Sequence, residues 1–98
     1  MRTRVVHFRD ICNDALILFE TRNKQYGDAI KETGVLGATV ELIAVTARLK
    51  QLVVKAPNHF PDHNAPKQRE QIRNALIDAH NYANIGLMMF DEENWNGE

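Results

Sequence analysis

Three carboxylates on two predicted helices are the residues of this chain best suited to chemistry. Glu41 lies in a segment predicted to be helical over about 35–55, the second apolar segment of the chain. Glu70 and Asp78 lie in the third such segment, over about 65–90. If these two segments pack as antiparallel helices, the three side chains can converge. Carboxylate oxygens are the ligands that Mg²⁺ prefers, and the ion often bridges substrate phosphates. The three residues therefore predict a magnesium site that takes a phosphorylated ligand.

The third segment also carries polar side chains inside an apolar pattern. Residues three or four apart share one face of a helix, so Glu70, Asn74, Asp78 and Asn81 form a single stripe. Asp78 and Asn81 are flanked by apolar residues on both sides. A buried carboxylate or amide is costly unless it is paired, hydrogen-bonded or bound to a ligand. This stripe indicates a binding site.

A structural interpretation of the same residues stands beside the functional one. Asp78 can be satisfied by Arg48 or by Asn81, and Glu41 can pair with a neighbouring cation on its own helix. Glu70 then lies in the first turn of its helix, in contact with solvent. For Glu70 the structural interpretation is the better one, and for Asp78 the two are balanced.

Other kinds of chemistry have weaker support in the sequence. There is no serine or cysteine triad pattern and no glycine-rich phosphate loop. Cys12, the only cysteine, lies on an apolar stripe, which is typical of an inert core residue. Lys24 and Tyr26 precede a glycine and can contact a phosphate or a base. In the alternative, structural interpretation, these two residues belong to a helix end that is in contact with solvent.

Composition limits the classes of protein. With 98 residues, the chain has room for one domain and one modest core. A net charge of −1 gives no strong signal for nucleic acid or for an acidic membrane surface. The first residues lack the apolar run of a signal peptide, and no run is long enough to span a membrane. We expect a cytoplasmic protein.

Apolar periodicity predicts an all-α fold with three main helices, over about 6–26, 35–55 and 65–90, and an acidic tail over 91–98. Gly27 is the expected stop of the first helix. The second helix is apolar on two sides. One side carries Leu36, Val40, Ile43, Ala47 and Val54, and the other carries Leu42, Val45, Leu49, Leu52 and Val53. Since two short helices cannot cover both sides, we expect a homodimer or a higher homo-oligomer.

Two sets of short motifs resemble a known family. The first set is 24–27 (KQYG), 34–37 (GVLG) and 47–52 (ARLKQL), and the second runs from Glu70 through Asn74 and Asp78 to 81–83 (NYA). Together they resemble the nucleotide modification associated domain (type 1) of phages and bacteria. That domain is distantly similar to the MazG-like all-α nucleoside triphosphate pyrophosphohydrolases.

The resemblance implies an oligomeric MazG-like bundle that binds a nucleotide. In the MazG-like enzymes, acids on two neighbouring helices hold Mg²⁺ against the triphosphate, and Asp78 and Glu41 stand at matching positions. Ala44 and Ala75 stand where those enzymes carry further acids. The remaining nucleotide contacts that we predict are Lys24, Tyr26, Arg48, Asn74, Asn81 and Tyr82, with Glu70 as a third metal ligand by position.

The sequence thus predicts a nucleotide-binding helical domain. A Mg²⁺-dependent pyrophosphohydrolase with a depleted ligand set is the enzymatic form of this prediction. The alternative is a structural or protein-interaction oligomer without turnover.

Overall fold

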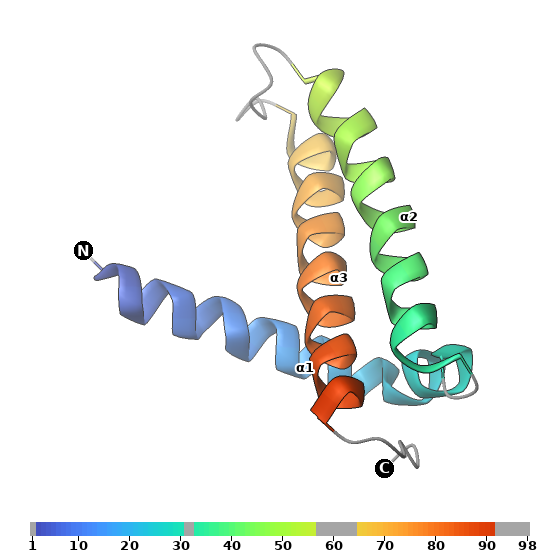
Figure 1. The fold of residues 1–98 in the computed structure, drawn as a ribbon. Helices are drawn as coiled ribbons and strands as arrows, with labels where there is room; N and C mark the ends of the chain where they lie inside the picture. The colour runs from blue at the N-terminus through green and yellow to red at the C-terminus, as the bar shows by residue number, and fades with distance from the viewer. Residues whose placement is uncertain (1, 31–32, 57–64, 92–98) are drawn as a thin grey trace.

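Three α-helices make up the fold. The computed structural model describes residues 2–30, 33–56 and 65–91, with the backbone alone for 24–30. Helix α1 spans Arg4–Ile30, α2 spans Gly34–Val54 and α3 spans Pro66–Asp91 (Figure 1). The predicted all-α class with three main helices is confirmed for these ranges. Most of the predicted acidic tail, residues 92–98, lies outside the described residues.

The end of α1 differs from the prediction. The helix passes through Gly27 and ends at Ile30, whereas we expected it to stop near residue 26. A glycine stops a helix by taking a left-handed conformation, and the described glycine with a positive φ is Gly34, at 61°. Among the described residues, the left-handed conformation between α1 and α2 is therefore that of Gly34. Gly27 costs α1 only the helix propensity of a glycine, about 1 kcal/mol relative to alanine.

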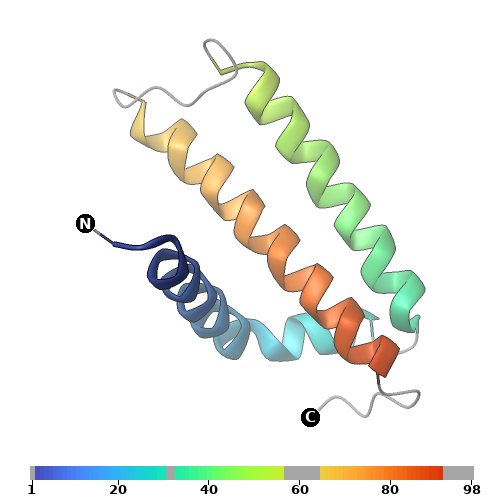
Figure 2. The same cartoon turned by 60° about the vertical axis from the view of Figure 1, so that its left-hand side comes forward.

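The helices form an antiparallel pair with a third helix across it. Helices α2 and α3 lie side by side along most of their length, while α1 crosses one end of this pair. The N-terminal half of α1 projects away from the pair in Figure 1, and it is seen nearly end-on in Figure 2. None of the described helices has the combination of length and apolar character that crossing a membrane requires.

The centre of the core lies where the three helices meet. Ala38, Ile85 and Met89 are buried together, and Phe19 and Tyr82 pack against them. Apolar spacing in the sequence predicts a buried face of α3 made of Ile72, Ala75, Leu76, Ala79, Ala83, Gly86, Leu87 and Phe90. The observed buried face differs in part, because α1 and α2 cover two different sides of this helix. Its buried residues are Ile72, Ala75, Ile77, Asn81, Ile85 and Met89, whereas Leu76, Leu87 and Phe90 of the predicted apolar face are exposed.

One side of α2 is not covered by the rest of the described chain. Val45 is buried, and Leu42, Leu49, Leu52 and Val53 around it are half-buried. The opposite side is exposed, with exposed fractions of 70% for Leu36 and 62% for Ile43. We call this exposed set the α2 stripe; it comprises Leu36, Val40, Ile43, Ala47 and Val54.

Two glycines of opposite conformation give a first testable prediction. Gly34→Ala should lower the free energy of unfolding by about 1–2 kcal/mol, because a left-handed φ strains an L-residue. Gly86→Ala should raise it by about 0.5–1 kcal/mol, because alanine has the higher helix propensity. The added Cβ at residue 86 would lie 3.7 Å from the Ala38 Cβ, an ordinary contact. Urea unfolding measures both changes in the free energy of unfolding. Changes of the same sign would contradict the left-handed conformation of Gly34.

Candidate functional site

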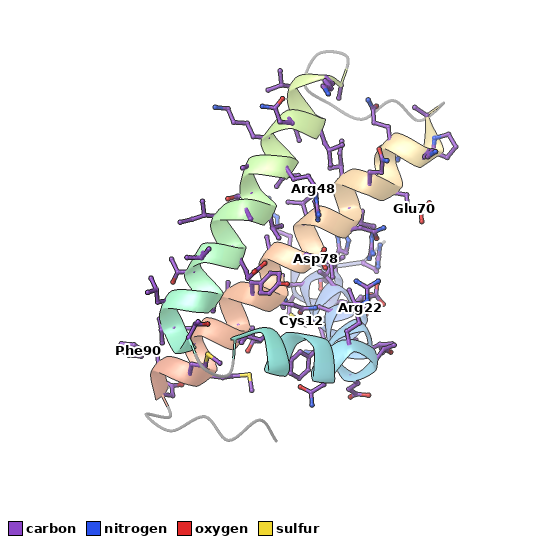
Figure 3. All side chains as sticks on the ribbon, turned by 90° about the vertical axis from the view of Figure 1, so that its right-hand side faces the viewer. Cys12, Arg22, Arg48, Glu70, Asp78 and Phe90 are labelled. Atoms are coloured by element: carbon purple, nitrogen blue, oxygen red, sulfur yellow. The ribbon has the colours of Figure 1, made fainter. Side chains whose placement is uncertain are left out.

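An ion pair joins the middle of α2 to the middle of α3. Arg48 Nη2 donates a hydrogen bond to Asp78 Oδ2 at 3.3 Å (Figure 3). The Arg48 side chain is 58% exposed, while that of Asp78 is 19% exposed. Asp78 is therefore mostly buried, as its place in an apolar pattern indicates. It pairs with Arg48, the cation that the structural interpretation of the sequence predicts.

A shallow pocket adjoins this ion pair. It has a volume of about 270 Å³ and is lined by Arg48 and Leu52 of α2 and by Gln71 and Asn74 of α3. We call it the α2–α3 pocket. Asp78 is not one of the lining residues, but it follows Asn74 by one helical turn and binds Arg48, so three of the predicted site residues lie in or beside this pocket. The pocket offers one guanidinium and two amide side chains.

The three predicted metal ligands do not converge within one chain. Glu70 precedes Asp78 by eight residues of continuous helix, which is about 12 Å along the axis. Its side chain is exposed and points away from the ion pair (Figure 3). Glu41 precedes Arg48 by seven residues, or about 10 Å along α2. Within the described residues, no three side chains of the metal-ligating types gather at one place.

The remaining predicted contacts are placed elsewhere. Asn81 is 4% exposed and faces α1, where its Nδ2 donates to the Ala15 carbonyl oxygen at 3.2 Å. Tyr82 packs against the core. The side chains of Lys24 and Tyr26 lie outside the described residues. Asn81 thus has a structural role that holds α1 to α3, and the sequence alone does not distinguish this role from ligand binding.

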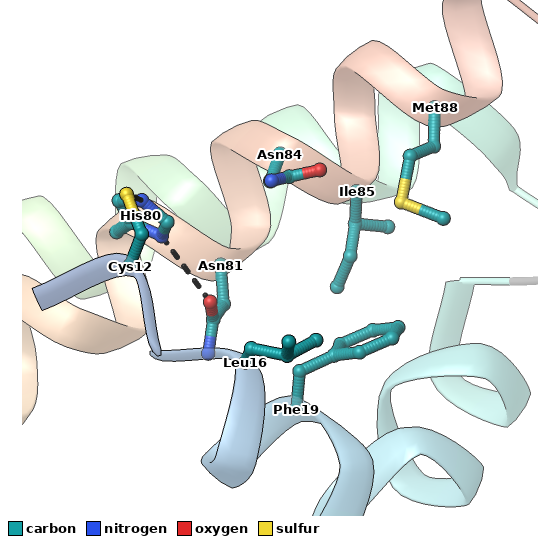
Figure 4. Close-up of a pocket in the computed structure, with 8 residues that line it drawn as sticks. All are labelled: Cys12, Leu16, Phe19, His80, Asn81, Asn84, Ile85 and Met88. Carbon is teal, nitrogen blue, oxygen red and sulfur yellow. Dashed lines mark hydrogen bonds between the residues drawn. The ribbon is translucent and has the colours of Figure 1, made fainter. Parts of the chain in front are cut away.

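A larger pocket lies between α1 and α3, and Asn81 is the one of its lining residues that the sequence predicts as a ligand contact. Its volume is about 390 Å³, and we call it the α1–α3 pocket (Figure 4). Its lining consists of Cys12, Leu16 and Phe19 from α1 and of His80, Asn81, Asn84, Ile85 and Met88 from α3. Cys12 Sγ lies 4.0 Å from His80 Nε2. These two residues are 68 positions apart, and no spacing rule brings them together before the crossing point of the helices is known.

Comparisons of this chain with protein-family models, with curated proteins and with solved structures found no match. The resemblance to the nucleotide modification associated domain therefore stays a prediction that rests on the motifs.

Proposed function

We propose that this chain is a MazG-like helical subunit that binds a nucleotide, or another small phosphorylated ligand, at the α2–α3 pocket. The observation that supports this proposal most is the meeting of Arg48, Asn74 and Asp78 at one place between two helices. These residues come from both halves of the antiparallel pair, and each was predicted as a ligand contact from the sequence.

The chemistry of the pocket suits a phosphate group. A guanidinium presents five N–H donors in a planar fork that matches two phosphate oxygens. Arg48 is largely exposed, so its donors are accessible to a ligand. Asn74 and Gln71 add amide N–H groups at the same pocket without adding charge. A phosphate held here would compete with Asp78 for Arg48.

Mg²⁺ would relieve that competition. The ion is commonly held by one or two protein carboxylates together with the phosphates of the substrate. Asp78 is the carboxylate that fits this role, because it adjoins the pocket. Glu70 lies too far along α3 to share one ion with Asp78 in the same chain, and in the described residues no third ligand joins any pair of possible metal ligands. The described residues of a single chain therefore supply at most two metal ligands at one place.

So small a set of metal ligands favours binding over turnover. Metal-assisted hydrolysis needs an ion that is fixed well enough to orient the attacking water, and a misplacement of about 1 Å can cost ~10²-fold in rate. Ala75, which stands where the resembled enzymes carry a glutamate, is fully buried. Ala44, the other departure, is exposed on α2. We therefore propose a binding function with slow or absent release of pyrophosphate.

A thermal-shift series with nucleotides, with and without Mg²⁺, tests the proposal. A ligand at ten times its Kd stabilises the native state by about 1.4 kcal/mol, which corresponds to roughly 6–11 °C for a chain of this size. Arg48→Gln should abolish the shift. Arg73→Gln is the matched control, because Arg73 forms a comparable exposed ion pair with Asp14 at 2.8 Å. If no nucleotide raises the melting temperature of the parent, the proposal is wrong.

Asp78→Asn should separate nucleotide binding that depends on Mg²⁺ from nucleotide binding that does not. The amide keeps the shape of the side chain but removes the charge, so any binding that depends on Mg²⁺ should be lost. Binding without Mg²⁺ should strengthen, because the carboxylate no longer competes for Arg48. Asp14→Asn, which breaks the Arg73 ion pair instead, should change neither. Titration of each variant with a nucleoside triphosphate measures the effect, and unchanged Mg²⁺ dependence would make Asp78 purely structural.

The α2 stripe favours a second function. A large exposed apolar area on a small protein commonly marks a protein interaction surface. The alternative proposal is a structural or interaction subunit that associates through α2 and binds no nucleotide. The thermal-shift series separates the two proposals, because only a nucleotide-binding subunit gains stability from the ligand.

A further inference from the structure

Cys12, His80 and Asn81 form a continuous chain of contacts in the α1–α3 pocket. Cys12 Sγ lies 4.0 Å from His80 Nε2, and His80 Nδ1 lies 3.3 Å from Asn81 Oδ1 (Figure 4). The order is thiol, imidazole, amide. A nucleophile beside a base, with a third group that orients the base, is the arrangement that activates side-chain nucleophiles in many enzymes.

The buried amide determines which ring nitrogen of His80 carries the proton. Asn81 Nδ2 donates to the carbonyl oxygen of Ala15, so Oδ1 is the end of the amide that faces His80. An amide oxygen only accepts hydrogen bonds, and Nδ1 must therefore be the protonated nitrogen in neutral His80. The Nε2 lone pair is then directed to the Cys12 side. Asn81 is a positioning residue for a base that can take the thiol proton.

The pocket beside this thiol admits a small apolar molecule. Its volume of about 390 Å³ lies within the range of small-molecule sites. Leu16, Phe19, Ile85 and Met88 supply apolar walls. Cys12, His80 and Asn81 lie at one end of the pocket, and Asn84 lies between that end and Ile85 (Figure 4). Cys12 is only half-buried. A purely structural thiol does not require an open cavity beside it.

We propose that the α1–α3 pocket is a thiol-modification site, at which Cys12 adds to a small apolar α,β-unsaturated carbonyl compound. Sγ forms a bond to the β-carbon, and the π electrons of the carbon–carbon double bond move to the α-carbon. His80 Nε2 takes the thiol proton and returns it to the α-carbon. No atom leaves, and neither an oxidant nor a reductant takes part. This proposal is independent of nucleotide binding at the α2–α3 pocket.

The test uses N-phenylmaleimide on the native chain, with the adduct at Cys12 followed by intact mass. His80→Gln should slow the addition by about 10²-fold, the lower end of the range for general-base catalysis. His7→Gln, which changes an exposed histidine of α1, should leave the rate within a factor of two. Cys12→Ser should give no adduct. Equal rates for the parent and His80→Gln, with both folded by circular dichroism, would overturn the proposal.

A second measurement decides the question if His80→Gln does not fold. The parent should react with N-phenylmaleimide faster in its native state than in urea, because unfolding separates Cys12 from His80. The native preference for N-phenylmaleimide over N-ethylmaleimide should also exceed the preference in urea, because only the folded chain offers apolar walls. A native rate below the rate in urea would identify Cys12 as a protected core residue and overturn the proposal.

Discussion

Ile43→Glu should prevent self-association of this chain without unfolding it. Ile43 lies in the centre of the α2 stripe and is 62% exposed. Leu36, Val40, Ile43, Ala47 and Val54 follow the alternating three- and four-residue spacing of a helix seam, with Lys50 at the one polar position. An unpaired carboxylate in the middle of such an interface costs at least about 2 kcal/mol, or roughly 30-fold in Kd.

Light scattering and sedimentation at micromolar concentration measure this effect. The parent should be at least a dimer and the Ile43→Glu variant a monomer, with equal helix content by circular dichroism. Asn13→Glu is the control, because it adds the same charge at an exposed position of α1. A monomeric parent would contradict self-association through the α2 stripe.

Ile85→Ala should lower the free energy of unfolding by about 2–5 kcal/mol. Ile85 is 2% exposed and packs in the cluster where the three helices meet. Truncation of a buried isoleucine removes its transfer free energy and leaves a cavity. Because domains of this size are stable by only about 5–15 kcal/mol, the loss is a large fraction of the total.

The matched control is the same substitution at a solvent-exposed position. Ile17 is 62% exposed on α1, so Ile17→Ala should change the free energy of unfolding by less than about 0.5 kcal/mol. Ile85→Val should fall between the two, at about 0.5–1.5 kcal/mol. Urea unfolding monitored by circular dichroism gives all three values. An Ile85→Ala effect no larger than that of Ile17→Ala would place the centre of the core elsewhere.

The helices themselves could be predicted because their signals are local. The apolar spacing and the turn residues locate α2 and α3 to within one or two residues. Gly27 shows the limit of such signals, since a glycine permits a helix stop without requiring one. The buried face of α3 was harder to predict, because it depends on where α1 crosses. That crossing buries Ile77 and Ile85 and leaves Leu76 and Leu87 exposed.

The contacts of the site residues depend on how the helices pack against one another. Arg48 and Asp78 meet as an antiparallel pair of helices allows, and the sequence offered this pairing as an alternative to a metal. Asn81 was predicted as a ligand contact because it interrupts an apolar pattern, and an amide that bonds a neighbouring helix interrupts the pattern in the same way. The contact between Cys12 and His80 has no sequence signal, because it arises only from the angle at which α1 lies on α3.

The projecting half of α1 has a mechanical consequence. The contacts of α1 with α3 at Cys12, Asp14 and Ala15 lie near the middle of a 27-residue helix, and Phe19 joins the core just beyond them. A tilt of α1 about these contacts would therefore move the N-terminal end of the helix farther than its middle. Its outer arm, from Arg4 to Ala15, is about 16 Å long, so a tilt of about 10° moves its tip by about 3 Å. A molecule that widened or narrowed the α1–α3 pocket would change this tilt. It would thereby shift the N-terminal end of α1, where Val5 and Phe8 are exposed.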